Sequence, residues 1–170
     1  MCGSIKPWLL VCMTGCGCVT LAACGDMASR GSSVYREGLM TPSGEPAYIT
    51  VQHCLIGFEG SVPSKNIMRK KDEAERLAQE WFGKAQAGED FAKIVVAHTD
   101  DSPPGIYRMA NDGFPGDMTQ RNPNKQVYPR GSMVPGFGDV GFKLKVDEIG
   151  LIPYDPTTSP FGWHIVKRIK

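Results

Sequence analysis

No long block of charge of one sign occurs in this sequence. Nineteen Lys and Arg residues nearly balance 18 Asp and Glu residues, so the formal net charge is +1. The short basic run at residues 69–71 is followed at once by Asp72 and Glu73, as expected of a solvated helix start. Proteins that bind nucleic acid through charge gather their positive residues on one face, so we expect no nucleic-acid partner.

Cysteine is nearly absent beyond the N-terminal region. Five of the six cysteines lie in the first 24 residues, namely Cys2, Cys12, Cys16, Cys18 and Cys24. Cys54 stands by itself further along, so the sequence holds no disulfide framework for a folded domain. No second pair of ligands at zinc-type spacing accompanies Cys16 and Cys18, so we expect no metal site.

The N-terminal apolar run, from Trp8 to Val19, is too short and too rich in glycine for a membrane-spanning helix, which needs about 20 apolar residues. It follows Lys6, the only early positive charge, and precedes small residues. A basic start, a modest apolar run and small residues before a cleavage point are typical of a secretory signal. We therefore expect residues 1–23 to be a signal peptide.

This predicted signal ends in Leu21-Ala22-Ala23-Cys24, followed by Gly25. These residues resemble the lipobox of bacterial lipoproteins, in which the chain is cut before the cysteine and the thiol is lipidated. The resemblance implies an exported protein anchored to a bacterial membrane, on the periplasmic or outer face, by acyl chains that contribute about 0.8 kcal/mol per buried CH2. Met13 to Cys16 is a weaker second candidate, and an ordinary signal peptide with an incidental Cys24 is the other alternative. Residues 24–47, rich in Gly, Ser and Pro, are expected to be a flexible tether.

Residues 48–170 carry the periodic patterns of a folded domain. Residues 48–58 alternate as a strand that is apolar on both faces, which indicates a central place in a sheet. Residues 66–87 repeat apolar side chains at helical spacing. The other predicted elements are a helix at 90–98 capped by Asp90, a strand at 106–109, a helix at 135–144 and strands at 148–153 and 162–169. Strands at both ends with helices between them favour an α+β fold.

Six short blocks of this region follow the order of a known family. They are residues 53–56 (His-Cys-Leu-Ile), 87–92 (Ala-Gly-Glu-Asp-Phe-Ala), 99–102 (Thr-Asp-Asp-Ser), 131–137 (Gly-Ser-Met-Val-Pro-Gly-Phe), 145–149 (Lys-Val-Asp-Glu-Ile) and 161–167 (Phe-Gly-Trp-His-Ile-Val-Lys). Through these blocks, residues 49–170 resemble the parvulin family of peptidyl-prolyl cis–trans isomerases. The resemblance implies the parvulin fold, a four-stranded antiparallel sheet surrounded by helices.

The resemblance also implies an active site. It assigns catalysis to His53, Asp101 and His164, and substrate binding to Met133, Phe137, Ser159 and Phe161. The two histidines match a pair that lies side by side on central strands, and the aspartate matches a position held by Cys or Asp. Met133 and Phe137 match the residues that form the pocket for the proline ring. Ser159 matches a hydroxyl position near the histidines, and Phe161 a position that is often aromatic.

The chemistry of the prolyl bond agrees with these residue types. Its barrier comes from amide resonance, and unaided isomerisation takes about 10–100 s. A protein lowers this barrier by binding the twisted amide better than the planar one. Apolar side chains supply a cup for the ring, while two imidazoles and a carboxylate supply the polar surroundings. This reaction needs no covalent step, no cofactor and no metal, so we expect Asp101 to act electrostatically and through hydrogen bonds.

The sequence departs from the family pattern in one segment. Parvulins usually carry Gly-Gly-Asp-Leu-Gly between the acidic turn and the Met-x-x-x-Phe block, and here that segment is replaced. The third apolar wall of the pocket therefore falls to Tyr107, Met109 or Met118, of which we take Met109 as the prediction. Residues 111–130 form either a flap over the site or a surface loop. No Arg or Lys cluster stands where phosphate-directed members place one, so we expect no preference for phosphopeptides.

Taken as expectations, these features describe an exported, lipid-anchored, monomeric prolyl isomerase. Its partners would be proline-containing peptides and unfolded exported proteins, together with the membrane that holds its lipid anchor. The alternative is a binding module or holdase chaperone that keeps the groove and has lost turnover.

Overall fold

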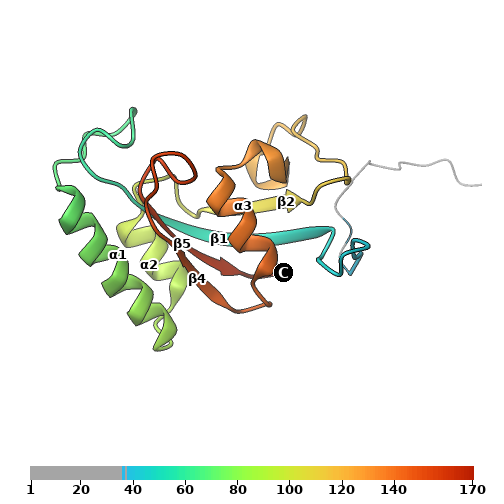
Figure 1. Ribbon diagram of the computed structural model, residues 1–170, viewed down its shortest axis with the longest axis horizontal. Helices are drawn as coiled ribbons and strands as arrows, with labels where there is room; N and C mark the ends of the chain where they lie inside the picture. Colours follow the sequence, from blue (N-terminus) through green and yellow to red (C-terminus); the bar gives the residue numbers. More distant parts are fainter. Residues whose placement is uncertain (1–35, 37) are drawn as a thin grey trace, which may run out of the picture. The chain divides into compact units, whose positions relative to one another are not determined.

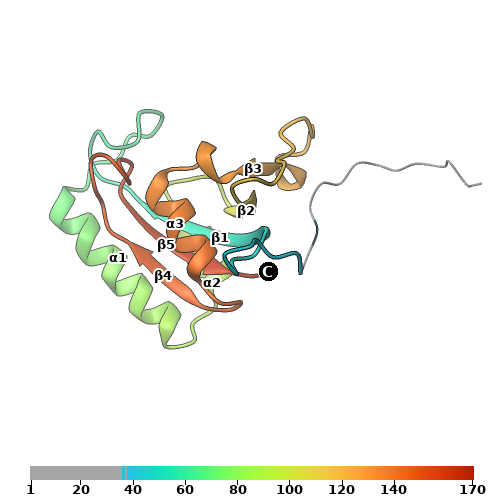
Figure 2. The same cartoon turned by 45° about the vertical axis from the view of Figure 1, so that its right-hand side comes forward.

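A five-stranded sheet with the order β3-β2-β1-β5-β4 organises the domain (Figure 1; β3 is labelled in Figure 2). The computed structural model describes residues 36 and 38–170. The strands are β1 (Tyr48–Ile56), β2 (Ile106–Ala110), β3 (Val127–Pro129), β4 (Ile149–Ile152) and β5 (Trp163–Arg168). The pairs β1–β2, β1–β5 and β4–β5 are antiparallel, whereas β3 runs parallel to β2. The α+β arrangement is confirmed, but the expectation of four strands, all antiparallel, missed β3.

The fifth strand comes from the segment that was expected to be a flap or a loop. It is three residues long and is surrounded by Gly, Pro and Asn, so no alternation of polar and apolar residues announces it. Its pairing with residues 108–110 of β2 forms only in the folded chain. Two short 3-10 helices, η1 (Pro123–Lys125) and η2 (Arg130–Ser132), flank it.

Helices cover both faces of the sheet (Figure 2). Helices α1 (Lys71–Gln86) and α2 (Phe91–His98) pack on one face, against a cluster that includes Ile56, Trp163 and Ile165. Helix α3 (Pro135–Lys143) packs on the other face, against Ile49 and Val51 among others. All nine residues of β1 are buried between the two layers, which confirms the predicted central strand.

Helix α1 begins five residues later than the sequence pattern predicted. The Arg69 guanidinium forms an ion pair with the Asp100 carboxylate and donates to the Gly57 carbonyl at 3.1 Å. The Arg69 carbonyl in turn accepts the Glu59 N–H at 2.9 Å. These contacts hold residues 66–70 outside the helix, so α1 starts at Lys71. The predicted cap of α2 is confirmed, because the Asp90 side chain accepts the Ala92 N–H at 3.0 Å.

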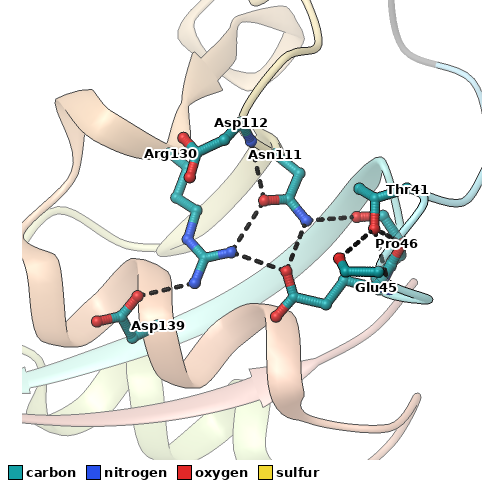
Figure 3. A network of polar contacts seen from close by, with 8 residues as sticks. Thr41, Glu45, Pro46, Asn111, Asp112, Arg130 and Asp139 are labelled. Atoms are coloured by element: carbon teal, nitrogen blue, oxygen red, sulfur yellow. Dashed lines mark hydrogen bonds and ion pairs between the residues drawn. The ribbon is translucent and has the colours of Figure 1, made fainter.

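The packed domain begins before the predicted boundary at residue 48. Ala47 is fully buried, and Arg130 joins the preceding segment to the body of the domain (Figure 3). The Arg130 guanidinium donates to the Glu45 carboxylate at 3.0 Å, to the Asn111 side-chain oxygen at 2.9 Å and to the Asp139 carboxylate at 2.7 Å. The last part of the predicted tether is therefore anchored to α3 and to the start of the 111–130 segment. The predicted signal peptide and Cys24 lie outside the described residues.

None of the helices within residues 38–170 has the length and apolar character needed to cross a bilayer.

Candidate active site

A cavity of about 260 Å³ opens on the α3 face of the sheet. The sheet contributes His53, Leu55, Tyr107 and His164 to its walls. The turn before α3 and the helix itself contribute Met133, Val134 and Phe137, and three loops contribute Val62, Asp101 and Phe161. The walls are therefore mainly apolar, with two imidazoles, one phenol and one carboxylate among them.

Strand register places the two histidines together. His53 pairs with Val166, and Leu55 pairs with His164, so the imidazoles are diagonal neighbours on one face of the sheet. Helix α3 covers the other end of that face, where Ile49, Val51 and Val166 form its core. The helix begins only at Pro135, so the end of the sheet that bears the histidines is left open as the cavity.

The imidazoles are hydrogen bonded to each other. His53 Nε2 and His164 Nδ1 lie 2.8 Å apart, and the rings stack at 4.9 Å between centroids. Both side chains are buried. The Phe137 ring meets each imidazole edge to face, at 5.0 Å from His53 and 6.0 Å from His164. The Phe137 ring therefore packs against both imidazoles and forms the wall of the cavity beside them.

Asp101 faces His53 Nδ1, the nitrogen of the His53 ring that points away from His164. Its Oδ2 lies 3.6 Å from His53 Nδ1, which is longer than a hydrogen bond, and accepts the Tyr107 hydroxyl at 2.5 Å. The nearby His53 holds the pKa of Asp101 well below its usual range, helped by hydrogen bonds from the Tyr107 hydroxyl and the Ser102 backbone N–H and opposed by burial. Asp101 is therefore an anion at neutral pH.

The anion determines which imidazole nitrogens carry protons. A carboxylate that faces His53 Nδ1 favours an N–H at that atom. His53 Nε2 is then the acceptor for an N–H on His164 Nδ1, which leaves His164 Nε2 as an unprotonated nitrogen. That atom is buried and has no hydrogen-bond partner within the described chain. Burial lowers the pKa of His164 to about 3, so this ring is neutral.

The structure brings together six of the predicted site residues: His53, Asp101, Met133, Phe137, Phe161 and His164 all line the cavity. Two other predicted residues lie elsewhere. Met109 is on the same face as Tyr107, but it is two residues further along β2 and fully buried beneath α3. Ser159 is fully buried, and its hydroxyl donates to the Gly162 carbonyl at 2.9 Å, which closes the turn before β5. Neither side chain lines the cavity, so the assignment of these two residues to substrate binding stays a prediction without support from this geometry.

The third wall of the cavity is Tyr107. Alternation along β2 puts residues 107 and 109 on the same face of the sheet. The sequence pattern therefore identified the correct face, but it could not show which of the two residues lies at the end of the sheet that α3 leaves uncovered. Val62 joins the wall from a loop that shows no periodic pattern. Its neighbour Ser61 donates a hydrogen bond to the Phe161 carbonyl at 2.9 Å, which ties the two loops together at the rim.

Residues 111–130 do not line the cavity within the described chain. They pack behind it, where the Tyr128 ring of β3 lies 5.6 Å from the ring of Tyr107. Of the two interpretations of this segment, the surface position fits the structure and the flap does not.

A buried histidine pair, an aspartate and an apolar cup on an α+β sheet are the features of the parvulin class of prolyl isomerase domains. Residues 39–169 match the family described as the PPIC-type PPIASE domain. The chain therefore belongs to this family of parvulin-type peptidyl-prolyl isomerase domains. The match begins at residue 39, which agrees with the packed segment before β1.

Individual relatives are similar over part of their length. The Chaperone SurA of Pseudomonas fluorescens is 32% identical over 119 residues, which is 70% of this chain and 22% of the relative. The Foldase protein PrsA of a Geobacillus species is 36% identical over 93 residues, which is 55% of this chain and 27% of the relative. The chain thus spans roughly a quarter of the length of each of these relatives. The solution structure of TbPIN1 matches 73% of this chain and 98% of that one, with a TM-score of 0.52 and 18% identity, which shows the shared fold.

Proposed function

We propose that this domain accelerates rotation about X-Pro bonds of exported proteins without a covalent intermediate. The observation that carries the proposal is the cavity in which an apolar cup adjoins the hydrogen-bonded histidine pair and Asp101. Relatives named as a chaperone and as foldases support a role in protein folding. Proline-containing segments of unfolded exported proteins are the substrates we assign to the site.

The proposed mechanism is preferential binding of the twisted amide. Met133, Phe137 and Phe161 hold the proline ring and exclude water from the bond. The planar amide owes its stiffness to a resonance form with negative charge on oxygen, and that form loses stability in an apolar cavity beside a carboxylate. Asp101 therefore disfavours the resonance that resists rotation. The neutral His164 adds no charge beside the bond.

An assay on short X-Pro peptides tests turnover. We expect the purified protein to accelerate cis-to-trans conversion, detected by a protease that cleaves only the trans form. The uncatalysed reaction over about 10–100 s is the reference. A protein that gives no acceleration, yet binds unfolded protein, would instead be the holdase alternative.

We further propose that the protein is exported and that acyl chains on Cys24 anchor it to a bacterial membrane. Support comes from the Leu-Ala-Ala-Cys motif behind an apolar run and from the short basic start at Lys6. Within the described residues, the backbone hydrogen bonds of the domain begin at Leu39, whose carbonyl accepts the Ala47 N–H at 2.7 Å.

A Cys24→Ala variant tests the anchor. Loss of the acyl chains removes about 0.8 kcal/mol per buried CH2, so the variant should move from the membrane fraction to the soluble fraction. Cys16→Ala is the matched control, since Cys16 ends the weaker motif, and this variant should stay with the membrane. Equal retention of the Cys24→Ala variant and the parent would contradict the anchor.

A further inference from the structure

Tyr107 lies in the segment where this chain departs from the family pattern, and it makes a contact that the sequence did not suggest. Its ring lines the cavity, while its hydroxyl reaches out of the sheet to the Asp101 Oδ2 at 2.5 Å. This distance is typical of a hydrogen bond between a hydroxyl donor and an ionised carboxylate. One oxygen of the carboxylate thus faces both the phenol and His53 Nδ1.

The backbone N–H of Asp101 donates to the Thr99 hydroxyl at 3.2 Å, but the Asp101 carboxylate is held by the Tyr107 hydroxyl and the Ser102 N–H. Asp101 lies in a bend between α2 and β2, and its side chain is 30% exposed. The adjacent Asp100 is turned away to the Gly57 N–H and Arg69, so it does not share the work at the site. Without the phenol hydroxyl, the Asp101 carboxylate gains rotamers that face solvent instead of His53.

The phenol itself is fixed from the other side. The Tyr107 ring packs edge to face against three other rings. The distances between ring centroids are 5.8 Å to Phe137, 5.9 Å to His53 and 5.6 Å to Tyr128. Tyr128 belongs to β3, the strand that was missed in the sequence, and its hydroxyl donates to the Gln126 side-chain oxygen at 2.9 Å. The ring of Tyr128, rather than its hydroxyl, therefore holds Tyr107 in place, and Tyr107 in turn holds the carboxylate.

We propose that Tyr107 is a positioning residue of the active site, whose hydroxyl fixes the Asp101 carboxylate against His53 and so sets the tautomer of both imidazoles. The effect on protonation passes from Tyr107 through Asp101 and His53 to His164 Nε2. Within the described chain, His164 Nε2 and His53 Nδ1 are the two buried ring nitrogens without a hydrogen-bond partner. The link to turnover rests on the proposed isomerase function, whereas the link to the tautomers does not depend on it.

The test compares Tyr107→Phe with Tyr128→Phe. Both changes remove one hydroxyl and keep the ring, but only the first hydroxyl contacts Asp101. Imidazole ¹⁵N chemical shifts distinguish protonated from unprotonated nitrogens, and the sequence has only three histidines to assign. In the parent and in Tyr128→Phe we expect an N–H at His53 Nδ1 and a bare His164 Nε2. In Tyr107→Phe we expect averaged signals from two tautomers.

The kinetic arm uses the same variants on an X-Pro peptide. Tyr107→Phe should lower kcat by roughly tenfold or more with KM little changed, as expected for loss of a hydrogen bond to a charged group. Tyr128→Phe should match the parent. Unchanged ¹⁵N shifts in Tyr107→Phe overturn the inference, and so does an unchanged kcat when the parent is active. If the parent itself shows no turnover, the proposed function fails and the ¹⁵N shifts alone decide the role of Tyr107.

Discussion

Replacing Phe137 by leucine should lower kcat/KM for X-Pro peptides by at least roughly tenfold, which corresponds to about 1.4 kcal/mol of lost transition-state binding. The reason is geometric. Phe137 is buried, lines the cavity and contacts both imidazoles edge to face, whereas leucine lacks the flat ring that closes the cup over them. Isomerisation of an X-Pro peptide, measured at several substrate concentrations, gives the change directly.

Phe142 provides a matched control on the same helix. It is as deeply buried as Phe137, at 2% exposure each, but it lies in the core under α3 and does not line the cavity. Phe137→Leu and Phe142→Leu should each cost about 1–2 kcal/mol of unfolding free energy, because each leaves a similar void. Only Phe137→Leu should lose activity beyond its loss of stability. Equal activity losses in the two variants would show that Phe137 acts through packing alone.

Mild acid should destabilise the domain through His164. The unfolded chain takes up a proton near pH 6.5, whereas burial lowers the pKa of folded His164 to about 3. Between these values the unfolded state binds more protons, so the unfolding free energy falls as the pH falls. The loss is about 2 kcal/mol at pH 5. The pKa of Asp101 is also lowered, so its own contribution is lost only below its unfolded pKa near 3.8.

Urea denaturation at pH 7 and at pH 5 measures this loss. His164→Asn keeps a polar group near His53 but removes the titrating ring, so its unfolding free energy should depend less on pH over this interval. His98→Asn is the control, because His98 stacks on Trp81 at the end of α2, on the other face of the sheet. That variant should lose as much stability as the parent on acidification. An unchanged pH dependence in His164→Asn would rule out His164 as the source.

Most of the fold could be predicted from local patterns. Alternation along residues 48–56, helical spacing along 71–86 and the Asp90 cap each depend on neighbouring residues, and the structure confirms them. The start of α1 was wrong because Arg69 is held by Asp100, a residue far along the chain. The short strand β3 was missed because three residues carry no period, and its hydrogen bonds are to β2.

The sequence by itself determined the chemistry of the site. Two histidines within strands, an aspartate in a turn and Met133 four residues before Phe137 are visible in the printed chain, and the structure gathers them around one cavity. It also determined the N-terminal pattern, which stays a prediction. Only the tertiary structure decided which side chains complete the cavity. Met109 and Tyr107 alternate to the same face of β2, and what separates them is where α3 begins, a matter of packing. Likewise, the hydrogen bond from the Tyr107 hydroxyl to the Asp101 carboxylate forms only when the turn that carries Asp101 folds back over β2. No local sequence pattern predicts this contact.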